Sequence, residues 1–288
     1  MSDVADSMAT GTASGDGHAP GRTGIRRDLV WMLAKQAFLQ RYRGSYLGVL
    51  WCLLVPIVMM AAYTFVFSGV FKARWGASER GPVFYALNLF CGLVPFQIFA
   101  EVICGTPSAI VGHANYVKKV VFPLEVIPVA CLVSALLTGA AQFVVLVAAT
   151  VFMKATGLCV LPDWPTWRLV FVPLSLVPLT LLSLGLGWFL SALGVFLRDI
   201  TTFTGILAQL VMFLSPIFYP IQAVPESVQK WIWLNPMTSI VTTLRGALLL
   251  NESPPWTALG ITSGAALAVM VLGHLFFART RAAFADVI

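Results

Sequence analysis

Acidic side chains, on which most enzymes depend for acid–base or metal chemistry, are scarce in this sequence. Only 12 of its 288 residues are Asp or Glu, and almost all of them stand in the terminal segments or between apolar runs. The sequence has no pattern of a phosphate-binding loop, a zinc protease or a nucleophile elbow. Its histidines, His18, His113 and His274, show no metal-ligand spacing. We therefore expect a protein that is not an enzyme and that holds no metal.

Glu101 is the acid that stands nearest to the interior of an apolar run. Carboxylates inside a membrane are costly and often serve proton relays. Because Glu101 falls close to the predicted cytoplasmic end of its run, we favour a structural role in which it pairs with a nearby Arg or Lys. A single acid in this place also counts against a transporter driven by protons or sodium, which would hold ionisable groups near the middle of the membrane.

The stretch "RYRGSYLGVLW", from Arg41 to Trp51, places two arginines and two glycines at the start of the first long apolar run. Arginine binds phosphate through two parallel hydrogen bonds, so Arg41 and Arg43 could contact the phosphate of a lipid carrier. Gly44 and Gly48 would let the chain turn from lying along the membrane to crossing it. We interpret the stretch as a joint that anchors the first span, and the phosphate contact as a hypothesis.

Aromatic residues are abundant, with 20 Phe, 9 Trp and 6 Tyr. Most of the Trp residues stand near the ends of apolar runs, where indole rings settle at the membrane surface. One aromatic group falls in the outer halves of the first and fifth apolar runs and consists of Tyr63, Phe67, Phe71, Phe213, Phe218 and Tyr219. The simpler interpretation is packing against lipid. The alternative is a path for a glycan, because aromatic faces contact the C–H faces of sugars without fixing their hydroxyls.

The composition indicates that lipid is the main solvent. Hydrophobic residues make up 59% of the chain and charged residues 10%, against about 25% charged residues in a typical soluble domain, and the mean hydropathy is +0.88. The net charge of +6 fits basic cytoplasmic flanks and anionic lipid better than nucleic acid. The five cysteines are scattered, mostly inside apolar runs, which is typical of packing residues.

The apolar runs predict an all-α integral membrane protein with six transmembrane helices. The spans are expected at about 47–71, 83–104, 126–153, 169–197, 201–219 and 257–277, within a domain that covers 47–279. Residues 1–24 predict a disordered cytoplasmic tail, residues 25–46 an amphipathic interface helix, and residues 280–288 a second cytoplasmic tail. An even number of spans puts both termini on one side, and the basic N-terminal flank places that side in the cytoplasm.

Two segments between the spans differ from ordinary loops. Pro220–Pro255 has apolar residues at helical spacing but breaks at Asn235-Pro236, which predicts two short helices that re-enter the outer leaflet.

The other segment, Gly105–Pro128, is short and basic. Within it, Ser108–Lys119 could form a brief helix along the cytoplasmic face. It is either a plain basic loop or a docking helix for a cytoplasmic partner. In the second case Tyr116 and Val117 would be the apolar anchors, and the two lysines that follow would be charges at the rim.

The order of several short stretches resembles that of permease subunits of ABC-2 type transporters. The resemblance rests on "RYRGSYLGVLW", "VFKARW", "HANYVKKVVFP", "LGVFLRDI", "SPIFYP" and "LNPMT", and it extends from about Arg26 to the C-terminus. It is closest to the polysaccharide-export branch, which moves lipid-linked O-antigen. Exporters of capsule and teichoic acid form related branches.

The resemblance implies a homodimer of six-span subunits that works with a dimer of a separate cytoplasmic ABC ATPase. ATP and Mg would be held by that partner, and this chain would need no cofactor. The interface helix, a coupling helix at Ser108–Lys119 and re-entrant helices at Pro225–Leu250 each match a part of such permeases. The contacts with the ATPase would be made by Ser108, His113, Asn115, Tyr116, Val117, Lys118 and Lys119.

The function that the resemblance implies is ATP-driven export of a lipid-linked polysaccharide, the O-antigen of lipopolysaccharide, across the bacterial inner membrane. An ABC-2 permease for capsule, teichoic acid, a drug or another lipid shares the fold and stays open as an alternative. An ion-coupled secondary transporter is a weaker one. A membrane-embedded glycosyltransferase would need acidic residues for a metal and a sugar nucleotide, and the predicted spans lack them.

Overall fold

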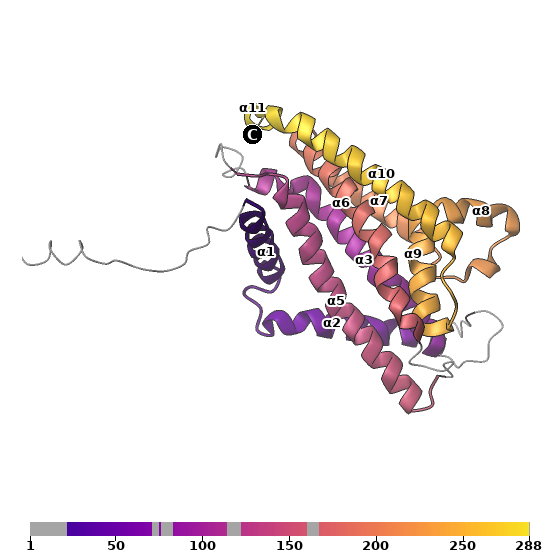
Figure 1. Ribbon diagram of the computed structural model, residues 1–288. Helices are drawn as coiled ribbons and strands as arrows, with labels where there is room; N and C mark the ends of the chain where they lie inside the picture. Colours follow the sequence, from indigo (N-terminus) through magenta and orange to yellow (C-terminus); the bar gives the residue numbers. More distant parts are fainter. Residues whose placement is uncertain (1–21, 71–74, 76–82, 114–121, 160–166, 288) are drawn as a thin grey trace, which may run out of the picture.

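The computed structural model describes residues 22–70, 75, 83–113, 122–159 and 167–287, and over these residues the chain is a bundle of helices without strands (Figure 1). Five helical stretches within these residues are long and apolar enough to cross a membrane. They are Gly48–Phe67, Val83–Ala109, Val126–Ala155, Trp167–Phe196 and Trp256–Ala283. The chain is therefore an all-α, multi-pass membrane protein, as its composition predicts.

The predicted fifth span is shorter than its apolar run. Helix α7 covers Ile200–Leu214, with 15 residues, whereas an upright crossing takes about 20. The helix ends because Ser215 is extended, with ψ at 146°, ahead of Pro216, and a proline ring disfavours helical geometry in the residue before it. The predicted span 201–219 thus ends at Leu214, and the count of six spans stays a prediction.

Helix α3, Val83–Ala109, forms the centre of the bundle, and 78% of its most apolar stretch is buried. Helices α5 (Val126–Ala155), α6 (Val172–Phe196) and α7 pack around it. Helix α10 (Trp256–Thr280) lies along α6 on the side away from α5 (Figure 1). The main core is therefore built on α3, and the outer helices each cover one part of it.

Glycines allow the helices to approach closely at two crossings. Where α6 crosses α10, a Cβ at Gly273 would overlap the carbonyl oxygen of Gly185. Where α6 crosses α3, a Cβ at Gly194 would overlap the carbonyl oxygen of Pro107. Small residues at such crossings let backbones meet, which is a main source of helix association in lipid.

The region between α7 and α10 contains two short helices, as the sequence predicts. Helix α8 covers Glu226–Leu234 and α9 covers Pro236–Arg245, continued by a π-helical turn over Gly246–Leu250. The break between α8 and α9 is at Asn235, whose Oδ1 accepts a hydrogen bond of 3.0 Å from the Met237 amide. That bond and the proline at the first helical position start α9. Whether α8 and α9 re-enter the membrane stays a prediction.

The N-terminal helix packs against the bundle. Helix α1 covers Arg22–Gln40 and ends before residue 46, the expected end of the interface helix. It buries Leu33 and Ala34 against Val126 and Ala130, at the start of α5, and it lies beside that end of α5 in Figure 1. The first span begins with a short 3₁₀ turn, Gly48–Leu50, followed by α2 (Trp51–Tyr63) and a π-helical turn (Thr64–Val70).

The first span, Gly48–Phe67, which contains α2, is the least covered of the five, since only 17% of its most apolar part is buried. The C-terminal segment is better packed than a free tail: Phe284 of the short helix α11 (Phe284–Val287) is fully buried beside Phe277. The nearby ion pair between Arg281 and Glu125, at 2.8 Å, ties this segment to the start of α5.

Candidate functional site

The joint between α1 and α2 is the part of the chain where the candidate residues lie closest together. Gly44 and Gly48 have φ angles of +86° and +49°, a conformation that side chains with a Cβ rarely adopt. The indole Nε1 of Trp51 donates a 2.7 Å hydrogen bond to Ser45 Oγ, which fixes the turn to the start of α2. The geometry explains why this sharp turn contains two glycines.

Arg41 binds the joint to two helices of the bundle. Its guanidinium forms an ion pair of 2.6 Å with Glu101 of α3 and donates a hydrogen bond of 3.3 Å to Thr138 Oγ1 of α5. The expected pairing of Glu101 with a basic residue is confirmed. Burial acts to lower the pKa of Arg41, but the Glu101 carboxylate outweighs it and the pKa is raised. Arg41 is thus a charged structural link, with its guanidinium already engaged.

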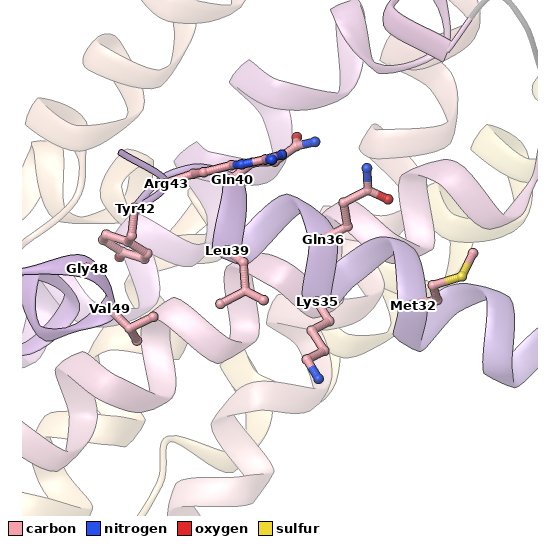
Figure 2. A pocket seen from close by; sticks show the side chains of 9 residues that line it. All are labelled: Met32, Lys35, Gln36, Leu39, Gln40, Tyr42, Arg43, Gly48 and Val49. Carbon is pink, nitrogen blue, oxygen red and sulfur yellow. The ribbon is translucent and has the colours of Figure 1, made fainter. Parts of the chain in front are cut away.

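Arg43, in contrast, lines an open groove at the joint. The groove has a volume of about 570 Å³ and is lined by Met32, Lys35, Gln36, Leu39, Gln40, Tyr42, Arg43, Gly48 and Val49. Figure 2 shows that these residues come from α1, from the turn that follows it and from the 3₁₀ turn at the start of the first span. None of the lining residues is acidic. Two cations, two amides and a phenol beside apolar side chains make a surface suited to an anionic headgroup attached to a lipid chain.

The residues expected to contact an ATPase fall partly in the described chain. Ser108 is the last residue but one of α3, which runs past the expected span end at Cys104. His113 ends a short 3₁₀ turn, and its Nδ1 lies 2.7 Å from the Ala109 carbonyl oxygen. The other members of the set, Asn115, Tyr116, Val117, Lys118 and Lys119, lie outside the described residues, so the coupling helix stays a prediction.

The aromatic residues proposed to line a glycan path lie in two neighbouring groups. Tyr63 and Phe67 pack near Tyr85 of α3, with the Phe67 and Tyr85 rings stacked at 5.2 Å. Phe213 stacks on Phe218 at 5.8 Å, and the Tyr85 hydroxyl donates to the Phe218 carbonyl. Tyr85 therefore joins the two groups.

Most of these aromatic rings are partly buried. Tyr63, Phe67 and Phe218 pack against the main core, and Tyr219 donates a 3.4 Å hydrogen bond to the Phe213 carbonyl. Phe213 is exposed, and Phe71 lies outside the described residues. A role for these residues in a glycan path stays a prediction.

Arg245 is a buried charged residue that the sequence analysis did not single out. Its exposed fraction is 5%, and its guanidinium binds backbone carbonyls from two other parts of the chain. The one signal in the sequence is its position in the run "LRGALLL", where a single cation interrupts apolar residues. Periodicity alone does not show which side of that helix is covered.

These features together define a multi-pass membrane protein with a basic joint before its first span. Residues 28–249 match the family of ABC-2 type transporters. Because the match covers most of the chain, the protein belongs to this family. It is also 28% identical to the O-antigen export system permease protein RfbA of Myxococcus xanthus, over 90% of this chain and 95% of that protein.

Two further relatives show the same breadth of similarity. An RfbA permease of Klebsiella pneumoniae is 25% identical over 91% of this chain and 95% of its own length. The polysialic acid transport protein KpsM of Escherichia coli is 25% identical over 85% of this chain and 91% of its own length. The family and its polysaccharide-exporting relatives confirm the resemblance that the short stretches indicated.

Proposed function

We propose that this chain is the permease subunit of an ATP-driven exporter that moves a lipid-linked polysaccharide, the O-antigen of lipopolysaccharide, across the bacterial inner membrane. The observation that carries this proposal is the near full-length similarity to O-antigen export permeases. The basic groove at the joint is consistent with it, since Arg43 and Lys35 lie where the anionic group of a lipid carrier would meet the membrane surface.

The proposed complex has two copies of this chain and two copies of a cytoplasmic ATPase, which supplies the ATP and Mg sites. Both termini would face the cytoplasm. In this arrangement the ATPase moves the joint and the end of α3, and the motion passes into α2 and α7. The wide exposure of apolar side chains on α2 and α7 is consistent with their facing lipid or a second copy.

Depletion of this protein in its own bacterium tests the proposal. Surface O-antigen should disappear while glycan linked to its lipid carrier accumulates inside, and both can be followed by gel analysis of lipopolysaccharide and mass spectrometry of extracted lipids. Loss of capsule or teichoic acid with O-antigen intact would assign the chain to a different export branch. Loss of export on dissipating the proton gradient, with ATP held constant, would instead support an ion-coupled carrier.

Arg43→Ala is expected to reduce export by about tenfold or more at equal protein level, because a hydrogen bond to a charged group contributes about 1.5–3 kcal/mol. Arg43→Glu should reduce export further, since it places a negative charge in the groove. The measurement is surface glycan per permease, quantified by immunoblotting. Arg27→Ala is the matched control, since Arg27 is exposed on α1, the helix before the joint, and does not line the groove. Unchanged export by Arg43→Glu would remove the groove from the proposed substrate path.

A further inference from the structure

Arg245, the last residue of α9, is held by backbone carbonyls. Its Nη1 donates to the Pro216 carbonyl at 3.0 Å, and its Nη2 donates to the carbonyls of Asn88 at 3.0 Å and Ile217 at 3.4 Å. The guanidinium also lies 4.3 Å from the centre of the Trp75 ring. Among the described residues, no carboxylate forms an ion pair with it. Burial of a cation without a counter-charge is costly. This cost indicates that the several N–H donors of the Arg245 guanidinium have a structural role.

The carbonyls that Arg245 binds belong to the segment directly after α7. We call Ser215–Phe218 the outer anchor. Three side chains from other elements hold it: Arg245 as above, the Tyr85 hydroxyl, which donates to the Phe218 carbonyl, and the Asn235 Nδ2, which donates to Ser215 Oγ at 2.9 Å. Ser215 and Ile217 are fully buried. The outer end of α7 is therefore fixed to α3 and to the start and end of α9.

The rest of α7 is held much less firmly. Within Ile200–Leu214, only Thr204 and Ala208 are buried. A row of apolar side chains on this helix is exposed in the single chain: Phe203, Ile206, Leu207, Leu210, Phe213 and Leu214. Elements with few buried contacts move more readily than the core around them. Helix α7 thus has one fixed end and a body that packs lightly on its own chain.

Local geometry explains why an arginine occupies this position. The planar guanidinium directs donors from separate nitrogens in a fixed fork, so it reaches carbonyls of two segments, whereas the three donors of a lysine ammonium all leave one nitrogen and span less space. Space for it is left by Gly92 of α3, where a Cβ would lie 3.1 Å from an Arg245 nitrogen and 3.3 Å from Ile217 Cγ2. A cation beside the C-terminal end of α7 also interacts favourably with the partial negative charge there.

We infer that Arg245 is a positioning residue that fixes the outer end of α7 to α3 and α9, so that α7 tilts about the outer anchor when its cytoplasmic end is displaced. This inference rests on the proposed function, because the displacement is the one that the ATPase would supply. Arg245 takes no part in binding substrate. It converts a push at one end of α7 into a tilt of the whole helix.

Distance measurements between spin labels test the tilt in the full chain with its ATPase in lipid nanodiscs. Nitroxides are attached to cysteines in a background without the five native ones, and labelled chains are diluted with unlabelled chains. The inner pair is Phe203→Cys with Leu275→Cys, and the outer pair is Leu214→Cys with Ile261→Cys, all exposed positions. On addition of a non-hydrolysable ATP analogue, the inner distance should change and the outer distance should not.

In the absence of nucleotide, Arg245→Met should broaden the distribution of distances between the outer pair of labels. It should also lower export by about an order of magnitude while ATP hydrolysis continues. In Arg245→Lys, both export and the width of the outer distance distribution should lie between those of Arg245→Met and the wild type. Arg168→Met is the matched control, because Arg168 also donates to a backbone carbonyl, that of Asn251, but contacts neither α7 nor the outer anchor.

A shift of the outer pair as large as that of the inner pair would overturn the inference, as would normal outer distances and normal export in Arg245→Met. If neither pair responds to nucleotide, the ATP-driven motion of the proposed function fails, and the tilt fails with it. Should Arg245→Met not assemble, the two pairs in the chain with Arg245 intact still decide between a tilt and a shift of the whole helix.

Discussion

Gly273→Ala is expected to lower the amount of folded protein in the membrane and the temperature at which the purified protein loses its fold. A Cβ at this position would overlap the carbonyl oxygen of Gly185 in the facing helix α6. Because the obstacle is backbone, the two helices must move apart along a contact that runs over much of their length. Overpacking costs about 1–3 kcal/mol and occasionally more, and a clash with backbone belongs at the upper end of that range.

Gly264→Ala is the matched control for this prediction. Gly264 is also in α10, but a Cβ there meets nothing within 4 Å, so the substitution should leave stability close to that of the wild type. Fluorescence-detected size-exclusion chromatography after heating compares the two variants at equal expression. Equal thermal stability of the two variants would mean that α6 and α10 do not meet at Gly185 and Gly273, and the packing of α10 would need revision.

The order and most of the bounds of the helices could be predicted from the sequence, because apolar runs and prolines mark them directly. Helix α7 shows where hydropathy alone fails. The run stays apolar to Tyr219, so hydropathy predicts a span that extends to that residue. Pro216 lacks an amide donor and forces Ser215 out of helical geometry, which ends the helix earlier. The proline marks the end of the helix in the sequence, whereas the apolar residues after it continue the hydropathy signal without continuing the helix.

The candidate site was predictable only where neighbours in the sequence are also neighbours in space. The basic joint from Arg41 to Gly48 was found because all its parts are adjacent. That Glu101 would pair with a basic residue followed from the cost of an isolated charge, but its partner Arg41 is distant in sequence. Arg245 was missed for the same reason, since one of its carbonyl partners, that of Asn88, lies 157 positions away.

Reversing the charges of Arg41 and Glu101 together is expected to restore export that either single reversal lowers. Arg41→Glu places two acids together, and Glu101→Arg places two cations together, between the joint and α3. The side chains of Arg41 and Glu101 are 41% and 16% exposed. The loss of stability in each single variant should therefore lie between about 0–1 kcal/mol, the contribution of a surface ion pair, and about 3–5 kcal/mol, the cost of breaking a buried one. Carrying both changes, the chain regains an attractive pair.

The control for this exchange is Arg27→Glu combined with Glu101→Arg. Arg27 is exposed on α1 and neither lines the groove nor pairs with Glu101, so this combination should not regain export. Export and ATP hydrolysis are measured together at equal protein level. If the link transmits motion from α1 to α3, the single variants that still assemble should hydrolyse ATP with little export. Equal recovery in both double variants would show that only the net charge of α1 and the joint matters, because a specific link requires recovery in the Arg41 pair alone.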